Sequence, residues 1–271
     1  MEVENNFIED KDSDSDTCED TSTVKVLTEY VEMNGVQSNN ELLIVGSHGN
    51  ASGFLKISLY TEFKNTPGSL KGKFFQINNK DKSKPKKLVA ELYQFKYQNN
   101  NALVILTKED LNFNNYKTIS DMLLNVNSEI NKVHKISIKK VICLDSKHYN
   151  DFVKEGDKSN MKNQTFFIKN KSYMKLNENT EGVSEIPVFN GVVGFSAYLI
   201  NKCDILNIPC VYYLASTSEY KVCLDNLNVF NSLKFLDFFK GKLEDDYLKS
   251  NKIDVSLLLK EFNHYQTSIF T

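Results

Sequence analysis

The sequence lacks any long apolar run, and this absence argues against a membrane-spanning helix. Its longest apolar stretches, at residues 141–144 and 211–215, are far shorter than the roughly 20 residues that a helix needs to cross a bilayer. The first residues, MEVENNFIEDKDSD, are acidic, whereas a signal or transit peptide would be apolar or basic there. We therefore expect a cytosolic protein, with the nucleus left open as a second location.

The sequence also lacks an excess of charge of either sign. It has 33 basic and 35 acidic residues, a net charge of −2, so no overall field would attract nucleic acid or a membrane surface. The five cysteines form no CxxC pair and are expected to be reduced, mostly buried thiols. The four histidines show no metal-ligand spacing, and we expect no metal and no other cofactor. These residues are Cys18, Cys143, Cys203, Cys210 and Cys223, and His48, His134, His148 and His264.

The length and composition are those of an ordinary globular protein. A chain of 271 residues with 41% hydrophobic and 25% charged residues suffices for one large domain or two small ones. Residues 1–22 combine like charges with serines and are predicted to be a disordered acidic tail. We assign residues 23–265 to a single α/β domain and residues 266–271 to a flexible C-terminal tail.

Apolar patterns along the domain predict strands that alternate with helices. Strands are expected at residues 42–45, 88–97, 102–107, 141–144 and 208–215. Helices are expected from 54 to 59, 119 to 133, 191 to 207, 229 to 239 and 255 to 262, and residues 26–31 also show helical spacing. The alternation predicts an α/β domain with a mostly parallel sheet and one antiparallel hairpin. Residues 146–185 follow no clear pattern and are expected to be a long, partly irregular insertion.

Two short motifs could carry chemistry. GSHG, residues 46–49, lies between a predicted strand and a helix, where backbone N–H groups can bind phosphate and His48 could act as an acid or base. It lacks the spacing of GxGxxG and the lysine of a P-loop, so a tight turn is the favoured interpretation. GFSAY, residues 194–198, half resembles a nucleophile elbow around Ser196, but the second glycine is missing. A helix whose small residues pack against the sheet explains it better.

A run of lysines lies within the polar segment QINNKDKSKPKK, residues 76–87. The favoured interpretation is a solvated loop, although such a loop can also steer an acidic partner. These residues are Lys80, Lys82, Lys84, Lys86 and Lys87.

Three stretches resemble the proteasome assembly chaperone 1 family, the larger subunits of a heterodimeric chaperone for the 20S α-ring. ELLIVGSHGNASGFL, from residue 41, resembles the family's first strand, turn and helix. AYLINKCDILNIPCVYYLASTSEYKV, from residue 197, resembles its helix and the aromatic-rich strand that follows. The final SIFT resembles the family tail, which ends in a hydrophobic residue, a tyrosine and one more residue. Their order fits residues 24–271, although segments 60–87 and 146–185 match poorly.

The resemblance implies a fold, partners and a mechanism. The fold would be a three-layer α/β/α sandwich similar to nucleoside phosphorylases but without their active site. The protein would not be an enzyme. Together with a second chaperone subunit it would bind 20S α-subunits, promote α-ring assembly and prevent off-pathway dimerisation of rings.

The same resemblance assigns a role to the last three residues. Ile269 and Phe270 would fill an apolar pocket between neighbouring α-subunits, while a pocket lysine would pair with the carboxylate of Thr271. Phe270 departs from the tyrosine of the family pattern. Two alternatives stay open: a nucleoside-phosphorylase-like enzyme that uses the GSHG turn for phosphate, and an adaptor whose tail binds another ring-shaped partner.

Overall fold

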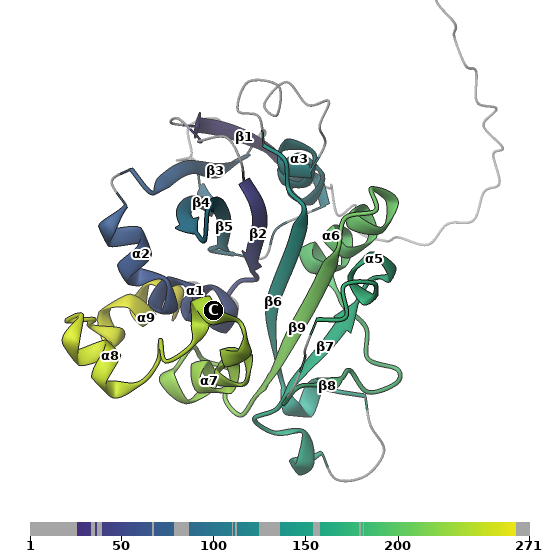
Figure 1. Ribbon diagram of the computed structural model, residues 1–271, viewed down its shortest axis with the longest axis vertical. Helices are drawn as coiled ribbons and strands as arrows, with labels where there is room; N and C mark the ends of the chain where they lie inside the picture. Colours follow the sequence, from purple (N-terminus) through teal and green to yellow (C-terminus); the bar gives the residue numbers. More distant parts are fainter. Residues whose placement is uncertain are drawn as a thin grey trace, which may run out of the picture.

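The computed structural model describes residues 26–33, 36, 40–66, 68–78, 87–109, 111, 113–124, 136–153, 158–178, 180 and 182–263. Within them, nine strands form one sheet in the order β1-β3-β4-β5-β2-β6-β9-β7-β8 (Figure 1). The strands are β1 (Val26–Met33), β2 (Asn40–Gly46), β3 (Leu70–Asn78), β4 (Lys87–Tyr97), β5 (Asn100–Thr107), β6 (Lys140–His148), β7 (Thr165–Lys169), β8 (Ser184–Glu185) and β9 (Cys210–Thr217).

Helices occupy most of the remaining described segments. The α-helices are α1 (Asn50–Ser58), α2 (Tyr60–Asn65), α3 (Phe113–Leu124), α5 (Lys171–Met174), α6 (Gly194–Ile205), α7 (Leu224–Asn228), α8 (Asp245–Ser250) and α9 (Val255–Asn263). The 3-10 helices are η1 (Tyr149–Asp151), η2 (Ser159–Met161), η3 (Val229–Phe235) and η4 (Asp237–Phe239). No described helix is long and apolar enough to cross a membrane.

The predicted α/β fold is confirmed, and the sheet is mixed around a parallel centre. The four neighbours β5, β2, β6 and β9 run parallel, as expected for strands joined through helices. The predicted hairpin is present as the antiparallel pair β4–β5. The structure adds the antiparallel pairs β1–β3, β3–β4 and β7–β9, which the sequence patterns did not predict.

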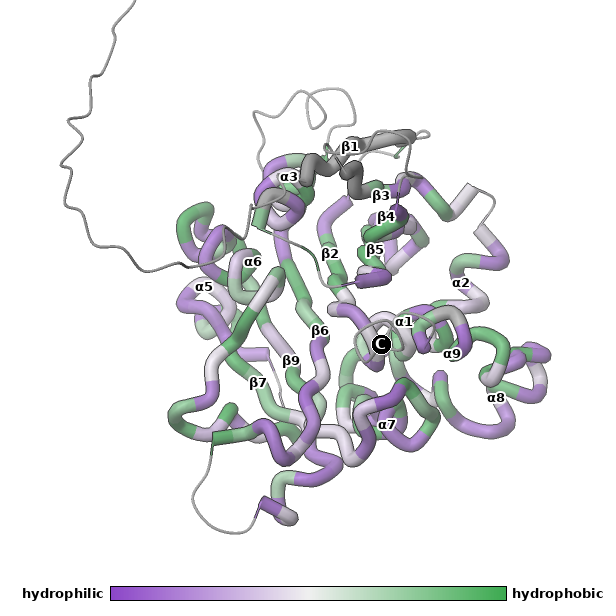
Figure 2. Tube along the Cα trace, turned by 180° about the vertical axis from the view of Figure 1, so that it is seen from behind, coloured by the Kyte–Doolittle hydropathy of each residue, from purple (hydrophilic) through white to green (hydrophobic). Residues whose placement is uncertain are grey.

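Helices cover both faces of this sheet because its central strands are apolar on both sides. Along β2, Leu42 and Ile44 belong to one hydrophobic cluster, whereas Leu43 and Val45 belong to the other. The first cluster includes residues of α1, α8, α9, η3 and η4, and the second includes residues of α3 and α6. Hydrophobic residues run along β6 and β9 between these layers (Figure 2). A strand that is buried on both faces has a continuous run of apolar residues in its sequence. This is why the sequence segments VICL and CVYYLA predicted strands.

Several expected helices are confirmed. The strand, GSHG turn and helix of the first motif appear as β2, the turn and α1, and the predicted C-terminal helix appears as α9. Helix α6 lies in the segment 191–207 as expected. The predicted helix at 119–133 begins earlier, with α3, and its part beyond Leu124 lies outside the described residues.

The prediction of a helix at residues 26–31 is wrong, because this segment forms β1. It pairs antiparallel with β3 from Val26 opposite Asn78 to Met33 opposite Gly72. The segment VLTEYVEM is rich in β-branched residues and contains a tyrosine, which favour an extended backbone. Pairing with the neighbouring strand outweighs a short helical spacing that no partner supports.

Residues 146–185 are more regular than predicted. Strand β6 continues to His148, and β7 lies inside the sheet between β9 and β8. Thr165 and Phe166 are buried there against β9. The aromatic and β-branched residues of TFFIK favour a strand, but surrounding asparagines and lysines obscured this signal.

The helix expected at 229–239 consists of the 3-10 helices η3 and η4. Four of its apolar residues are spaced by three, and all four are buried: Phe230, Leu233, Leu236 and Phe239. A 3-10 helix has three residues per turn, so η3 places Phe230 and Leu233 on one face, whereas the backbone at Leu236 is extended before η4 begins. Two short 3-10 helices and the extended residue between them therefore bury these four side chains.

The cysteines within the described residues are free thiols. Cys143, Cys203 and Cys210 are buried, as predicted, and Cys223 is half-buried. The contact of Cys203 with Cys210, together with burial, raises the pKa of the Cys203 thiol far above its ordinary value. A thiol with a raised pKa is a poor nucleophile, so Cys203 acts as a small hydrophobic residue.

A buried ion pair joins the sheet to the C-terminal helix. Lys108 is fully buried, and its Nζ lies 3.2 Å from Oε2 of Glu91. Tyr93 donates a hydrogen bond to the same carboxylate oxygen at 3.0 Å and accepts one from Lys56 at 2.7 Å. The Lys108 Nζ also lies 4.7 Å from the ring centre of Phe262 in α9. Helix α9 is thus fixed both by apolar packing and by a cation–π contact.

Glu91 should make the stability of the fold pH-dependent. Burial raises the pKa of this carboxyl, but the ammonium groups of Lys108 and Lys56 and the hydrogen bonds outweigh it, so the pKa lies below its ordinary value. A carboxyl whose pKa is lowered by folding stabilises the folded state at pH values above its unfolded-state pKa of about 4.5. This contribution is lost as the pH falls through the folded-state pKa.

We expect Glu91→Gln to lower the free energy of unfolding at pH 7 by about 3–5 kcal/mol, because the substitution removes the carboxylate that pairs with the buried Lys108 side chain. Urea unfolding at pH 7 and at pH 4 measures this. The difference from the unmodified chain should be smaller at pH 4. Asp245→Asn, which removes an exposed pair with Lys249, is the control and should change little. An equal small effect of both substitutions would contradict the prediction.

Candidate functional site

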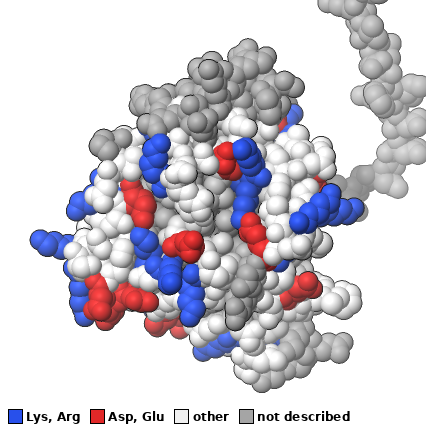
Figure 3. All heavy atoms as spheres, viewed as in Figure 1, with Lys and Arg blue, Asp and Glu red and all other residues white. Residues whose placement is uncertain are grey.

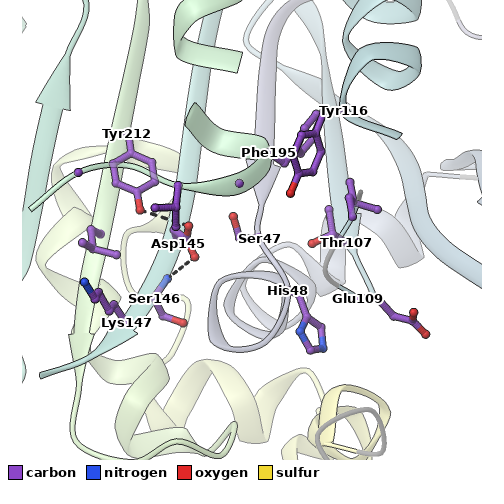
Figure 4. A pocket seen from close by; sticks show the side chains of 15 residues that line it. Ser47, His48, Thr107, Glu109, Tyr116, Asp145, Ser146, Lys147, Phe195 and Tyr212 are labelled. Carbon is purple, nitrogen blue, oxygen red and sulfur yellow. Dashed lines mark hydrogen bonds between the residues drawn. The ribbon is translucent and has the colours of Figure 1, made fainter. Parts of the chain in front are cut away.

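The candidate site is a cavity of about 300 Å³ at the carboxyl ends of the central strands (Figure 4). Ligand sites of open α/β sheets commonly lie at this edge. The lining residues come from the carboxyl ends of β2, β5 and β6, from β9 and α3, and from the segment that leads into α6. Its lining consists of Ser47, His48, Thr107, Glu109, Leu111, Tyr116, Asp145, Ser146, Lys147, Gly191, Val193, Gly194, Phe195, Tyr212 and Leu214.

The GSHG turn forms one wall of the cavity. Gly49 has a φ of +90°, as the predicted tight turn requires. The carbonyl oxygen of Gly46 accepts hydrogen bonds from the hydroxyls of Ser52, at 2.8 Å, and Thr107, at 3.0 Å. The Ser47 N–H donates to the carbonyl of Leu144 at 2.9 Å. The turn is therefore tied to α1, β5 and β6 at once.

The structure brings together the two motifs that the sequence analysis treated separately. The hydroxyl oxygens of Ser47 and Ser196 lie 3.1 Å apart. Ser196 is buried in the first turn of α6, so it occupies a helix, as expected, and not a strand–helix corner. This contact joins the end of β2 to the start of α6.

Asp145 and Tyr212 form a second polar group of the cavity. Asp145 accepts a hydrogen bond from the Ser146 N–H at 2.8 Å and one from the Tyr212 hydroxyl at 3.2 Å. Burial and the neighbouring Asp145 carboxylate raise the pKa of Tyr212 well above its ordinary value. Tyr212 therefore stays protonated and acts as a hydrogen-bond donor. Figure 4 shows this pair on one side of Ser47, with Thr107, Tyr116 and Glu109 on the other.

The charges around the cavity do not favour an anionic ligand. Glu109 and Asp145 are carboxylates, and Glu109 Oε2 pairs with Lys87 at 2.5 Å. Lys147 is the single lysine of the lining, and its Nζ lies 5.3 Å from the ring centre of Phe152. The sequence contains no arginine, the side chain best suited to bidentate phosphate binding. The cavity thus fits a small ligand that donates hydrogen bonds better than it fits a phosphate.

Sequence reasoning missed most of the residues that line this cavity, including Tyr116, Asp145 and Tyr212. Tyr116 stacks on Phe195 with ring centres 5.6 Å apart, and Asp145 and Tyr212 form the pair described above. Asp145 follows the apolar run VICL, so the rule that sites lie at carboxyl ends of parallel strands could have identified it. Tyr212 and Tyr116 carry no such signal, because buried tyrosines are common in any core.

Several residues singled out in the sequence lie elsewhere. His148 is outside the cavity, and its ring stacks on Tyr220 with centres 3.9 Å apart. Other predicted residues lie outside the described residues: Cys18, Lys80, Lys82, Lys84, Lys86, His134, His264, Ile269, Phe270 and Thr271. In the part of the chain that is described, no group of three or more His, Cys, Asp or Glu side chains could hold a metal ion.

The comparisons with known proteins rest on the fold. No protein-family model matches the sequence, and no curated protein matches it. Solved structures do match, and they define a class: the chain shares the fold of archaeal proteasome-assembly chaperone homologues. The fold expectation drawn from the resemblance is therefore confirmed, whereas the similarity to nucleoside phosphorylases stays a prediction.

Three structures illustrate the match. PbaA of Pyrococcus furiosus, an archaeal homolog of proteasome-assembly chaperone, is 15% identical with a TM-score of 0.54, covering 90% of this chain and 99% of PbaA. PbaB of the same organism, an archaeal proteasome activator, is 12% identical with a TM-score of 0.51, covering 90% and 97%. A protein of unknown function from Thermoplasma acidophilum is 13% identical with a TM-score of 0.52, covering 86% and 89%.

We expect Gly46→Ala to destabilise the GSHG turn. A Cβ at this position would lie 2.8 Å from Leu55 Cδ1 and 3.1 Å from the Ser52 backbone, so the loss should be about 1–3 kcal/mol. Thermal unfolding measures it. Gly191→Ala is the matched control at the same cavity, since no described atom lies within 4 Å of its added Cβ. Equal melting temperatures for both variants would contradict the prediction.

Proposed function

We propose that this protein is a non-enzymatic proteasome assembly chaperone. The observation that carries the proposal is the fold match with PbaA, which extends over nine-tenths of this chain and nearly all of that protein. The sequence resemblance to the proteasome assembly chaperone 1 family supports the same function independently of the fold.

In the proposed mechanism, the chain acts in the cytoplasm as a heterodimer with a second chaperone subunit. The heterodimer binds 20S α-subunits, favours their correct order in the ring and opposes dimerisation of rings. Such work depends on surfaces, and charges of both signs are interspersed over the face shown in Figure 3. An interspersed surface favours specific contacts over general attraction to a charged polymer.

The C-terminal tail would supply one of the contacts. Burying the side chains of Phe270 and Ile269 gives roughly 4–6 kcal/mol, and ordering the tail takes much of it back. The tail therefore acts as a second, tethered contact beside the globular surface. Phe262, which is buried against Lys108, fixes the helix that directly precedes the tail. A fixed starting point raises the effective concentration of the tail at a pocket near the bound surface.

Removing Ile269 to Thr271 should weaken binding to α-subunits at least tenfold, since both the apolar side chains and the terminal carboxylate are lost. Pull-down titrations with the tagged chain and with a chain ending at Ser268 measure this, and mass spectrometry identifies the captured α-subunits. Unchanged affinity would contradict the role of the tail. Failure of both chains to capture any α-subunit would contradict the chaperone function itself.

Phe270→Tyr should strengthen the same contact. Tyrosine restores the hydroxyl of the family pattern, and a new hydrogen bond of about 0.5–1.5 kcal/mol corresponds to a gain of about two- to tenfold in affinity. Phe270→Leu, which removes the ring and offers no hydroxyl, is the control and should weaken binding. Weaker binding of the Phe270→Tyr variant would show that the pocket is adapted to phenylalanine.

A further inference from the structure

A shallow hollow of about 690 Å³ lies beside the β7–β8 edge of the sheet and shares no lining residue with the cavity described above. Its floor includes the buried side chains of Met161 and Phe166, and its rim carries exposed apolar residues. The lining consists of Val153, Asn160, Met161, Gln164, Phe166, Pro187, Val188 and Phe189. We call these residues the Phe189 surface.

The rim exposes an unusual amount of apolar side chain. Phe189 is 85% exposed, Val188 76% and Val153 56%. Single exposed hydrophobic residues are ordinary on protein surfaces, but here three of them border one apolar hollow. Their transfer from water into a contact would be favourable, in proportion to the apolar area buried.

The loop that carries Phe189 is held in place by its neighbour Asn190. The Asn190 side chain accepts a hydrogen bond from the Val153 N–H at 2.7 Å and donates one to the Val153 carbonyl at 3.0 Å. It also donates to the carbonyls of Pro187 and Val188, at 3.2 and 3.3 Å. Phe189 itself has a φ of +67°, an unfavourable conformation for a bulky residue. These contacts hold an exposed ring where the hydrophobic effect alone would not place it.

The chemistry of the lining indicates what kind of surface it fits. None of the eight described residues that line it is charged, although 25% of the residues in the sequence are charged. Each of three other surface hollows includes charged side chains of both signs. They are Lys169 and Glu185 in the first, Lys234 and Glu244 in the second, and Glu41 and Lys139 in the third. Depletion of charge at the centre is typical of protein–protein interfaces, whereas membrane-binding surfaces place lysines beside their apolar residues.

We propose that the Phe189 surface is a contact between two copies of this chain. It carries a projecting aromatic ring and, next to it, an uncharged apolar hollow, so one surface provides both halves of a contact. A two-fold axis would place Phe189 of each copy in the hollow of the other, the arrangement of an isologous interface. This proposal concerns the chain alone and does not depend on the chaperone function.

The contact should be weak. A stable interface buries about 800 Å² on each partner, and three exposed side chains with one hollow supply only its centre. We expect a monomer–dimer equilibrium with a dissociation constant in about the micromolar range. The isolated chain would then be a mixture of monomer and dimer at ordinary laboratory concentrations.

Sedimentation velocity of the full chain, over about 1–100 µM, tests the proposal. We expect Phe189→Asp to raise the dissociation constant at least tenfold, because it would place a charge in an apolar hollow. Phe113→Asp is the matched control, since Phe113 is also a largely exposed phenylalanine, 64% accessible, and belongs to α3. It should leave the dimer unchanged. Phe189→Ala, which introduces no charge, should weaken the dimer in the same direction.

Three results would overturn the proposal. The unmodified chain could remain monomeric over the whole range, or the dimer could persist in both Phe189 variants. The chain could also bind phosphatidylcholine vesicles in a flotation assay and lose this binding with Phe189→Asp, which would assign the surface to a lipid. Circular dichroism of each variant must match the unmodified chain, and capture of α-subunits by the Phe189→Asp variant reports separately on the proposed chaperone function.

Discussion

The structure depends on one constraint: the central strands are apolar on both faces and must be covered on both. Alternate residues of β2 enter opposite clusters, and all residues of β9 are buried. A sheet of this kind needs a helical layer on each side, and helices that cross between parallel strands provide it. The same crossovers bring the ends of β2 and β5 together with the start of α6, and the cavity lies where these ends meet.

The helical layer that contains α9 is held by more than apolar contacts. Phe262 lies over the buried Lys108, whose charge is balanced by Glu91 from the neighbouring strand. Buried ion pairs seldom add net stability over a well-packed apolar core, but removal of one partner is costly. The network therefore constrains where α9 can lie, and with it the point from which the C-terminal tail begins.

The cavity at the carboxyl ends of the strands and the hollow beside β8 differ in chemistry, and each chemistry suits a different kind of ligand. The cavity at the carboxyl ends of the strands contains carboxylates, hydroxyls and aromatic rings, and its polar groups already bond to one another. Among the described residues, the lining of the hollow beside β8 includes no charged side chain, and exposed apolar side chains border it. The first is a candidate for a small ligand, and the second for a protein surface.

The sequence by itself determined the α/β class, the first strand–turn–helix unit, the hairpin, α6 and the buried cysteines, because each has a local apolar pattern that only one geometry satisfies. It did not determine β1, whose short pattern fitted a helix until β3 provided a strand partner, nor β7, whose signal was hidden among asparagines and lysines. Only the tertiary structure brought Ser47 to Ser196, Asp145 to Tyr212 and Asn190 to Val153. The physical reason is that local periodicity records which face of an element is apolar, whereas a site depends on which distant elements share that face.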